Sequence, residues 1–130
     1  MNSFELPITV TPADIDDLGH VNNVVYLRWM QQAAAAHWQA AATPELRASV
    51  AWVVIRHEID YKAPAFVGEA LLARTWVGEA TAATWERLSE VRRVADHKLL
   101  VQCRSRYVAL DPASGRPGRI TPLLRAPFAE

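Results

Sequence analysis

One stretch of helical periodicity, followed only by segments of strand periodicity, is the feature that most constrains the fold. In residues 21–42 apolar side chains recur at spacings of three and four, as at Tyr26, Met30 and Ala34. The segments that favour strands are residues 3–12, 50–62, 69–78, 82–94 and 98–110. Short connections between the later strands exclude a parallel crossover unit, so these strands are expected to be antiparallel. The sequence therefore predicts an α+β fold in which one long helix packs against an antiparallel sheet.

Alternation along each strand predicts which side chains are buried. In residues 3–12 one face carries Phe4, Leu6, Ile8 and Val10. In residues 50–62 the expected buried face carries Val53, Ile55, His57, Ile59 and Tyr61, whereas Trp52 and Val54 share the other face with charged residues. Turns are expected at residues 78–81 and 96–97, and a loop is expected at residues 111–118.

Size and charge exclude several classes of protein. The 130 residues fit a single domain spanning residues 1–130, and 51% hydrophobic content is enough for a core. Lys+Arg and Asp+Glu both number 14, which argues against binding nucleic acid or a membrane surface through bulk charge. Cys103 is the only cysteine, so no intrachain disulfide can form. With neither a signal-peptide pattern nor an apolar run of ~20 residues, a cytoplasmic location is expected.

The densest polar cluster lies directly before the helical stretch and contains Asp14, Asp16, Asp17, His20, Asn22 and Asn23. A helix N-terminus presents unpaired backbone N–H groups, which can stabilise an oxyanion on a substrate carbonyl. A carboxylate beside it could attack that carbonyl or deprotonate water, as acyl transfer requires. The alternative is that these residues only form turns and cap the helix, because Asp and Asn are common in both roles.

Two motifs carry a family resemblance. Residues 16–23 read DDLGHVNN and are followed by Tyr26-Leu27, while residues 60–65 read DYKAPA and are followed by Gly68-Glu69. In this order and at this separation, the motifs resemble those of hotdog-fold acyl-CoA thioesterases. The resemblance is to the 4-hydroxybenzoyl-CoA thioesterase-like branch that includes bacterial long-chain acyl-CoA thioesterases, and it covers about residues 4–111.

The resemblance implies a hotdog fold, in which a five-stranded antiparallel sheet wraps one long helix. It implies a homodimer with active sites at the subunit interface, often assembled into a tetramer. It also implies hydrolysis of an acyl-CoA substrate without a metal or an organic cofactor. The family's catalytic Asp corresponds to Asp16, which would attack the thioester carbonyl or activate water. The oxyanion donors would be backbone N–H groups around Asn23 and Val24.

The remaining candidate residues have competing interpretations. His20 could orient Asp16 or water, or could make only a structural hydrogen bond in the turn. Asn22 and Asn23 could contact substrate, although one of them is expected to cap the helix. Tyr26 could line the acyl pocket or belong to the core. Lys62 is the first candidate for the CoA phosphates; the weaker candidates are Arg56, Arg92 and Arg93.

Two other functions stay open: hydrolysis of acyl-carrier-protein thioesters, and non-catalytic binding of acyl thioesters by a hotdog module. Neither the preferred acyl chain nor the choice between dimer and tetramer follows from the sequence. His57-Glu58 opens a zinc-protease motif, but Tyr61 stands where that motif needs its second His, so no metal site is expected. Cys103 is expected to be a packed thiol rather than a nucleophile.

Overall fold

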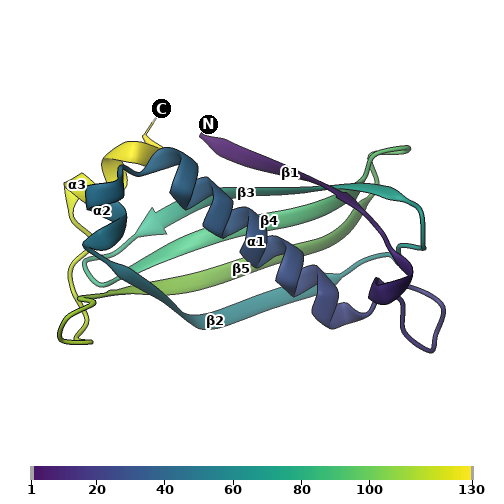
Figure 1. Ribbon diagram of the computed structural model, residues 1–130, viewed down its shortest axis with the longest axis horizontal. Helices are drawn as coiled ribbons and strands as arrows, with labels where there is room; N and C mark the ends of the chain where they lie inside the picture. The colour runs from purple at the N-terminus through teal and green to yellow at the C-terminus, as the bar shows by residue number, and fades with distance from the viewer. Residues whose placement is uncertain (1, 130) are drawn as a thin grey trace.

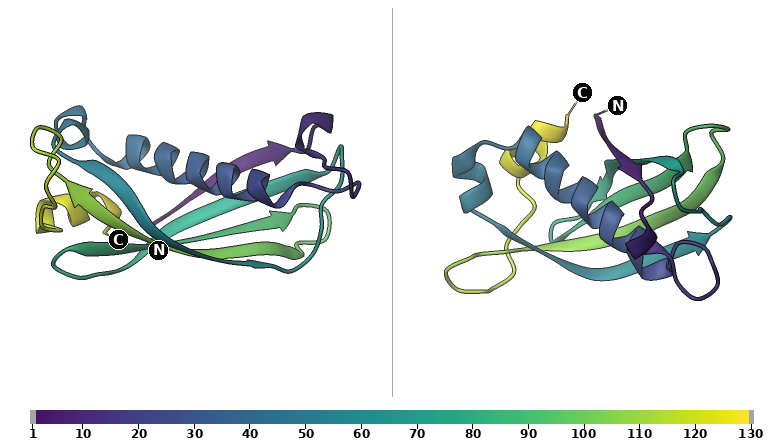
Figure 2. Two further views of the ribbon diagram at one scale, coloured as in Figure 1. Left: turned by 90° about the horizontal axis from the view of Figure 1, so that it is seen from below. Right: turned by 45° about the vertical axis from the view of Figure 1, so that its right-hand side comes forward.

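A long helix, α1 (Asn23–Ala41), lies across one face of a five-stranded antiparallel sheet in the computed structural model, which describes residues 2–129 (Figure 1). Two further views show the helix and the curved sheet as separate layers (Figure 2). The strands are β1 (Ser3–Thr9), β2 (Ala51–Tyr61), β3 (Ala70–Ala80), β4 (Thr84–Arg93) and β5 (Leu99–Leu110). The short helices are η1 (Pro12–Asp14), α2 (Pro44–Ala48), α3 (Pro122–Arg125) and η2 (Ala126–Phe128). The predicted α+β fold is confirmed.

Local chemistry sets both ends of α1. The Asn22 side chain accepts a hydrogen bond from the Val24 N–H at 3.0 Å and so caps the N-terminus. At the other end, Ala42 is extended and Thr43-Pro44 starts α2, because Pro44 cannot continue the preceding helix. The buried face of α1 packs on the sheet through Val25, Tyr26, Trp29, Met30, Ala33, Ala34 and His37.

The strand order β1-β3-β4-β5-β2 separates two strands that follow each other in the chain. β2 pairs with β5 at one edge of the sheet, while β3 lies between β1 and β4. Residues 62–69 therefore cross one end of the sheet to connect β2 to β3. The Val10 N–H donates to the Glu69 carbonyl at 3.0 Å, and the Gly68 N–H donates to the Val10 carbonyl at 2.9 Å. This crossing connection passes close to the start of α1.

The face predicted for β2 is wrong in its first half. Val53 and Ile55 are 41% and 56% exposed, whereas Trp52 and Val54 are half-buried. The cause is an irregularity in the pairing with β5, between Val54 and Arg56. An extra residue in a strand shifts every side chain before it to the opposite face. Beyond the bulge, His57 and Ile59 are half-buried as predicted, but Tyr61 is 44% exposed at the strand end.

The C-terminal segment completes the core at the end of the sheet near α2. Residues 111–118 form the predicted loop, but no pattern in the sequence predicted α3 and η2. Leu124 and Phe128 from these helices are buried with Val50, Trp85 and Ala109. The turn at residues 96–97 is confirmed, with His97 at a φ of 58°. The other predicted turn lies later than expected, because β3 continues to Ala80.

Candidate functional site

A narrow loop places Asp16 beside the start of α1. Ile15 and Val21 form an isolated antiparallel bridge, and the Asp16 N–H donates to the His20 carbonyl at 3.1 Å. The Gly19 N–H donates back to the Asp16 carbonyl at 3.0 Å, with Gly19 at a φ of +84° that L side chains rarely adopt. The polar cluster thus folds back on itself, with Asp16 at one side and His20 at the other.

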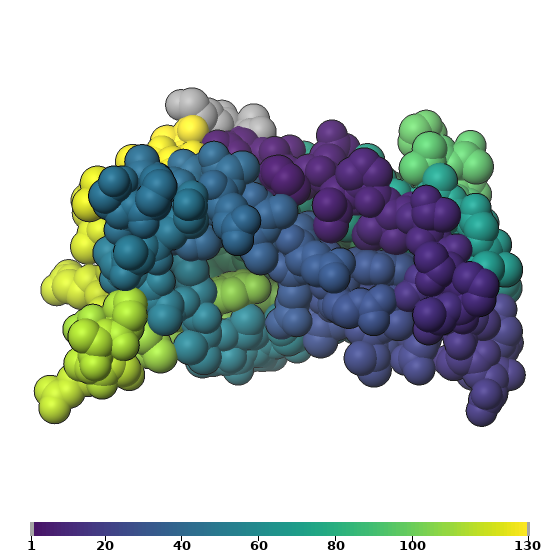
Figure 3. Space-filling view, viewed as in Figure 1, coloured from purple at the N-terminus to yellow at the C-terminus, as the bar shows by residue number. Residues whose placement is uncertain are grey.

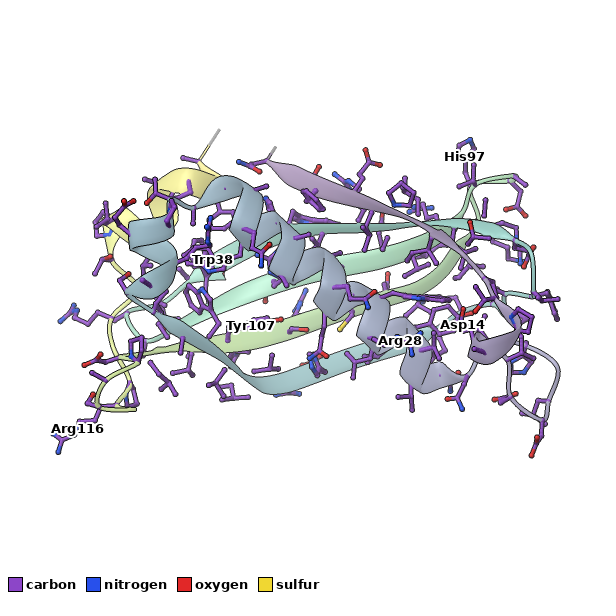
Figure 4. The ribbon with its side chains drawn as sticks, in the orientation of Figure 1. Asp14, Arg28, Trp38, His97, Tyr107 and Arg116 are labelled. Atoms are coloured by element: carbon purple, nitrogen blue, oxygen red, sulfur yellow. The ribbon has the colours of Figure 1, made fainter. Side chains whose placement is uncertain are left out.

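The three carboxylates of this segment have different environments. Asp14 is buried, accepts hydrogen bonds from Thr11 and pairs with Arg28 at 3.0 Å, so it serves the structure (Figure 4). Asp17 is exposed. Asp16 is half-buried, and its Oδ1 accepts the Leu18 N–H at 2.9 Å. Within residues 2–129 its Oδ2 has no hydrogen-bond partner. Asp16 therefore combines a fixed orientation with one unoccupied oxygen.

The helix start leaves one candidate oxyanion donor unpaired. The Val24 N–H is taken by the Asn22 side chain, and the Val25 N–H donates to the Asn22 carbonyl at 2.9 Å. The Asn23 N–H makes no hydrogen bond to the described residues. It lies at the positive end of the helix dipole, where an N–H group favours a negative charge. Of the two predicted donors, Asn23 is the one whose N–H remains available.

A cavity of about 250 Å³ opens where residues 62–69 pass the helix start. The Val21 N–H donates to the Ala65 carbonyl at 2.9 Å and joins the two segments. The lining residues are His20, Val21, Asn23, Tyr26, Tyr61, Lys62, Ala63 and Pro64. The structure therefore brings together four predicted site residues from the two sequence motifs: His20, Asn23, Tyr26 and Lys62. Asp16, Asn22 and Val24 lie in the adjoining loop and helix cap and do not line this cavity.

Two tyrosines form the inner wall of the cavity. Tyr26 is 2% exposed, its hydroxyl has no hydrogen-bond partner of good geometry among the described residues, and burial raises its pKa. The Tyr61 hydroxyl donates to the Asn23 carbonyl at 3.2 Å, and its ring lies 6.0 Å from that of Tyr26. No site role was predicted for Tyr61; its position directly before Lys62 in the second motif was the available signal. His20 Nδ1 lies 3.3 Å from the Val21 carbonyl.

Of the four basic side chains predicted to bind the CoA phosphates, only Lys62 lines the cavity, and the four differ in whether they are already paired. Arg56 pairs with Glu58, Arg92 with Glu90, and Arg93 with Glu69 and Asp96 at distances of 2.7–3.2 Å. Lys62 is exposed at the cavity and has no ion-pair partner among residues 2–129. An unpaired cation can bind a phosphate without first losing a carboxylate. Lys62 is therefore the strongest cationic candidate of the four.

The remaining candidate groups have structural partners. His57 Nδ1 lies 2.6 Å from Ser105 Oγ, and Cys103 Sγ lies 3.4 Å from the same oxygen. Burial raises the pKa of the Cys103 thiol, which disfavours the thiolate. In the part of the chain described, no group of three or more His, Cys, Asp or Glu side chains could hold a metal ion. Nor does any helix within residues 2–129 have the length and apolar character to cross a membrane.

Comparisons with known proteins agree with this architecture. A family model described as the thioesterase-like superfamily matches residues 10–128. A 4-hydroxybenzoyl-CoA thioesterase mutant in complex with 4-hydroxybenzoyl-CoA superposes with a TM-score of 0.90, at 14% identity over 99% of this chain and 100% of that one. A 1,4-dihydroxy-2-naphthoyl-CoA thioesterase from Synechocystis gives 0.83, at 18% identity over 97% and 95%. The dynemicin thioesterase gives 0.86, at 20% identity over 97% and 94%.

No curated protein sequence matches the chain significantly. These three solved structures are below 25% identity to the chain, so their likeness establishes the fold rather than the substrate. The hotdog fold predicted from the two motifs is confirmed.

Proposed function

The chain belongs to the thioesterase-like superfamily, which makes it a thioester hydrolase, and we propose that it hydrolyses acyl-CoA to a carboxylic acid and CoA at the Asp16 loop. The observation that carries this proposal is that one short segment holds both an Asp16 carboxylate oxygen without a partner among residues 2–129 and, at the start of α1, the free Asn23 N–H. Acyl transfer needs both a base or nucleophile and an oxyanion donor.

Asp16 and the Asn23 N–H can support hydrolysis by either of two routes. As a general base, Asp16 takes a proton from water while the hydroxyl oxygen bonds to the acyl carbon. As a nucleophile, Asp16 bonds to that carbon itself, so that loss of CoA leaves an anhydride of Asp16, which water hydrolyses in a second step. In either route the carbonyl oxygen becomes an oxyanion facing the Asn23 N–H. The C–S bond then breaks and CoA leaves as a thiolate, whose pKa is that of an ordinary thiol, so it needs no strong acid.

The residues of the cavity and of the adjoining helix cap position the substrate. His20 orients the attacking water or Asp16 from the far side of the loop. Asn22 holds the helix start in place through its bond to Val24. Tyr26 and Tyr61 form an apolar wall for the group next to the thioester, and Lys62 binds a phosphate of CoA at the cavity mouth.

A thiol-release assay tests the function. The substrate panel contains short, medium and long acyl-CoAs, 4-hydroxybenzoyl-CoA, 1,4-dihydroxy-2-naphthoyl-CoA, and an acyl-carrier-protein of matched chain length. Turnover of at least one CoA thioester above that of the matched carrier-protein thioester is expected. Faster release from the carrier protein would instead assign the carrier-protein function. Binding of acyl-CoA without release across the panel would overturn hydrolysis in favour of a binding module.

We further propose that the chain works as a homodimer, or as a tetramer of such dimers. β2 is an edge strand of eleven residues, and its outer face exposes Val53 and Ile55. A long edge strand with exposed apolar side chains favours pairing with a second chain. The zero net charge offers no repulsion against this association. A solution mass at a multiple of the 14.5 kDa chain tests the proposal.

Lys62→Met is expected to raise KM for acyl-CoA roughly threefold to tenfold with little change in kcat, because one exposed charge pair contributes modestly to binding. KM for the corresponding acyl-pantetheine, which lacks the nucleotide phosphates, should not change. Lys98→Met is the matched control, since Lys98 is the only other lysine and lies exposed in the turn after β4. An equal rise in KM for both substrates would contradict phosphate binding by Lys62.

A further inference from the structure

A second cavity, of about 330 Å³, lies between the C-terminal half of α1 and the sheet. In the space-filling view the surface is hollowed between α1 and β2, and yellow-green atoms of β5 show at its floor (Figure 3). Five of its twelve lining residues are aromatic: Trp38, Trp52, Trp85, Tyr107 and Phe128. Trp38 and Tyr107 face each other across the space beside α1 (Figure 4). Asn23 and Trp38 are separated by about 22 Å of helix, so in one chain this cavity is distinct from the Asp16 site.

The Arg87 guanidinium lies among these aromatic side chains. The Arg87 side chain is only 9% exposed and lines the cavity. Its Nη1 donates to Thr75 Oγ1 at 2.9 Å and to His37 Nδ1 at 3.1 Å. Burial lowers the pKa of Arg87 to about 10, so the guanidinium still carries its charge at neutral pH. A buried charge is costly unless an opposite charge or several hydrogen bonds stabilise it.

The described residues provide no counter-charge. His37 Nε2 lies 2.9 Å from Asn2 Oδ1, an acceptor, so Nε2 carries the proton and Nδ1 accepts from Arg87. His37 is therefore neutral, as are the hydroxyls of Thr75 and Ser89. Glu86, next to Arg87 on β4, also lines the cavity, but alternation along the strand points its side chain away from that of Arg87, and its carboxylate pairs with Arg104 at 3.4 Å. No carboxylate within residues 2–129 pairs with Arg87.

The Arg87 guanidinium also has N–H groups that make no hydrogen bond to the described residues. Arg87 Nε and Nη2 make no hydrogen bond to the described residues, and neither atom is sealed from solvent. A guanidinium binds carboxylates through paired N–H groups of this kind. The cavity volume is at the lower end of the range for small-molecule sites, which suits a ring system rather than a long chain. Flat aromatic walls favour a flat aromatic ligand.

We propose that this cavity binds an aromatic carboxylate, with the ring between the tryptophans and the carboxylate on Arg87. The carboxylate can belong to a free aromatic acid, or to the acyl group of a thioester substrate that carries a second carboxylate and is held at the Asp16 site of a second chain. The site does not depend on the proposed thioesterase chemistry, because neither Asp16 nor Asn23 lines it.

Calorimetric titration of the full chain with 2-naphthoate, and with 2-naphthamide as the uncharged match, tests the proposal without any turnover. Naphthoate is expected to bind at least about tenfold more tightly than naphthamide, the usual gain from a charge-assisted hydrogen bond. In Arg87→Met the two Kd values should come within about twofold of each other. Arg106→Met, which removes an exposed arginine of β5, should retain the wild-type preference.

A second variant keeps the proposal testable if Arg87→Met does not fold. Ala35 is an exposed residue of α1 at the cavity, so Ala35→Trp fills the mouth while Arg87 stays in place. This variant should melt like the wild type and lose naphthoate binding. Absence of saturable naphthoate binding to the wild type, or an unchanged preference in folded Arg87→Met, would overturn the proposal.

Inhibition of thiol release by naphthoate then identifies the source of the carboxylate. Competitive inhibition in the wild type, together with a raised KM for the thioester in Ala35→Trp, supports the cavity as the place of the substrate's acyl group. Saturable binding without competition supports a free acid as the ligand. Failure of the thioesterase proposal would remove this last measurement and leave the binding test intact.

Discussion

Asp16→Asn is expected to lower kcat for thiol release roughly 10²- to 10⁴-fold, the usual contribution of a general base or nucleophile. The amide can still accept the Leu18 N–H through its oxygen, so the loop should keep its shape. The substitution removes the negative charge and replaces the basic Oδ2, which has no partner among the described residues of the wild type, with an amide nitrogen. Circular dichroism and the thermal midpoint should therefore match the wild type, and acyl-CoA should still bind.

Asp17→Asn provides the matched control for this prediction. It makes the same chemical change one residue further on, in a side chain that is exposed. Its turnover should stay within about twofold of the wild type, because surface substitutions away from a site have small effects. Turnover of Asp16→Asn within about twofold of the wild type would remove Asp16 from the mechanism. A comparable loss in both variants would point to the charge of the whole loop instead.

The elements that the sequence predicted well are those governed by neighbours in the chain. The helix of residues 21–42 became Asn23–Ala41, because its apolar spacing and the Asn22 cap act within a few residues. The loop around Asp16 is local in the same sense, since its bonds join residues 15–21. For that reason the candidate carboxylate could be named from a short motif.

Features that depend on distant pairing could not be predicted in this way. The bulge between Val54 and Arg56 exists only relative to β5, and it moved Trp52 and Val54 to the helix side of the sheet. Without the bulge, Val53 and Ile55 would lie on the buried face, as the alternation predicts. No short stretch of the sequence predicts that β2 pairs with β5. The same is true of the hydrogen bond from the Tyr61 hydroxyl to the Asn23 carbonyl.

The aromatic cavity was missed for a related reason. It draws residues from α1, four strands and the C-terminal η2, so no contiguous motif marks it. Alternation along β4 did offer a signal, because Arg87 shares its face with Trp85 and Val91. Because an arginine in a strand is usually exposed to solvent, the sequence alone did not lead us to expect that Arg87 is buried. A charged residue in phase with the core of a strand is therefore worth testing as a ligand-binding group.

The second large effect is expected in the pH dependence of stability. His37 is 2% exposed, and burial, with the adjacent Arg87 charge as a smaller cause, lowers its pKa from the ordinary 6.5 to about 4. In the unfolded chain His37 takes up a proton below pH 6.5, whereas in the native chain it stays neutral down to pH 4. The unfolded state therefore binds more protons in this window, and the free energy of unfolding decreases as the pH falls through it.

The expected loss from His37 alone is about 3 kcal/mol between pH 7 and pH 4, because each pKa unit corresponds to about 1.4 kcal/mol. Urea unfolding at several pH values in this range measures it, and His37→Gln should remove this part of the slope. His97→Asn is the control: it removes an exposed imidazole from a turn whose φ of 58° Asn tolerates, so it should keep the wild-type slope. An identical slope in wild type and His37→Gln would show that burial does not hold the His37 imidazole neutral in the folded chain.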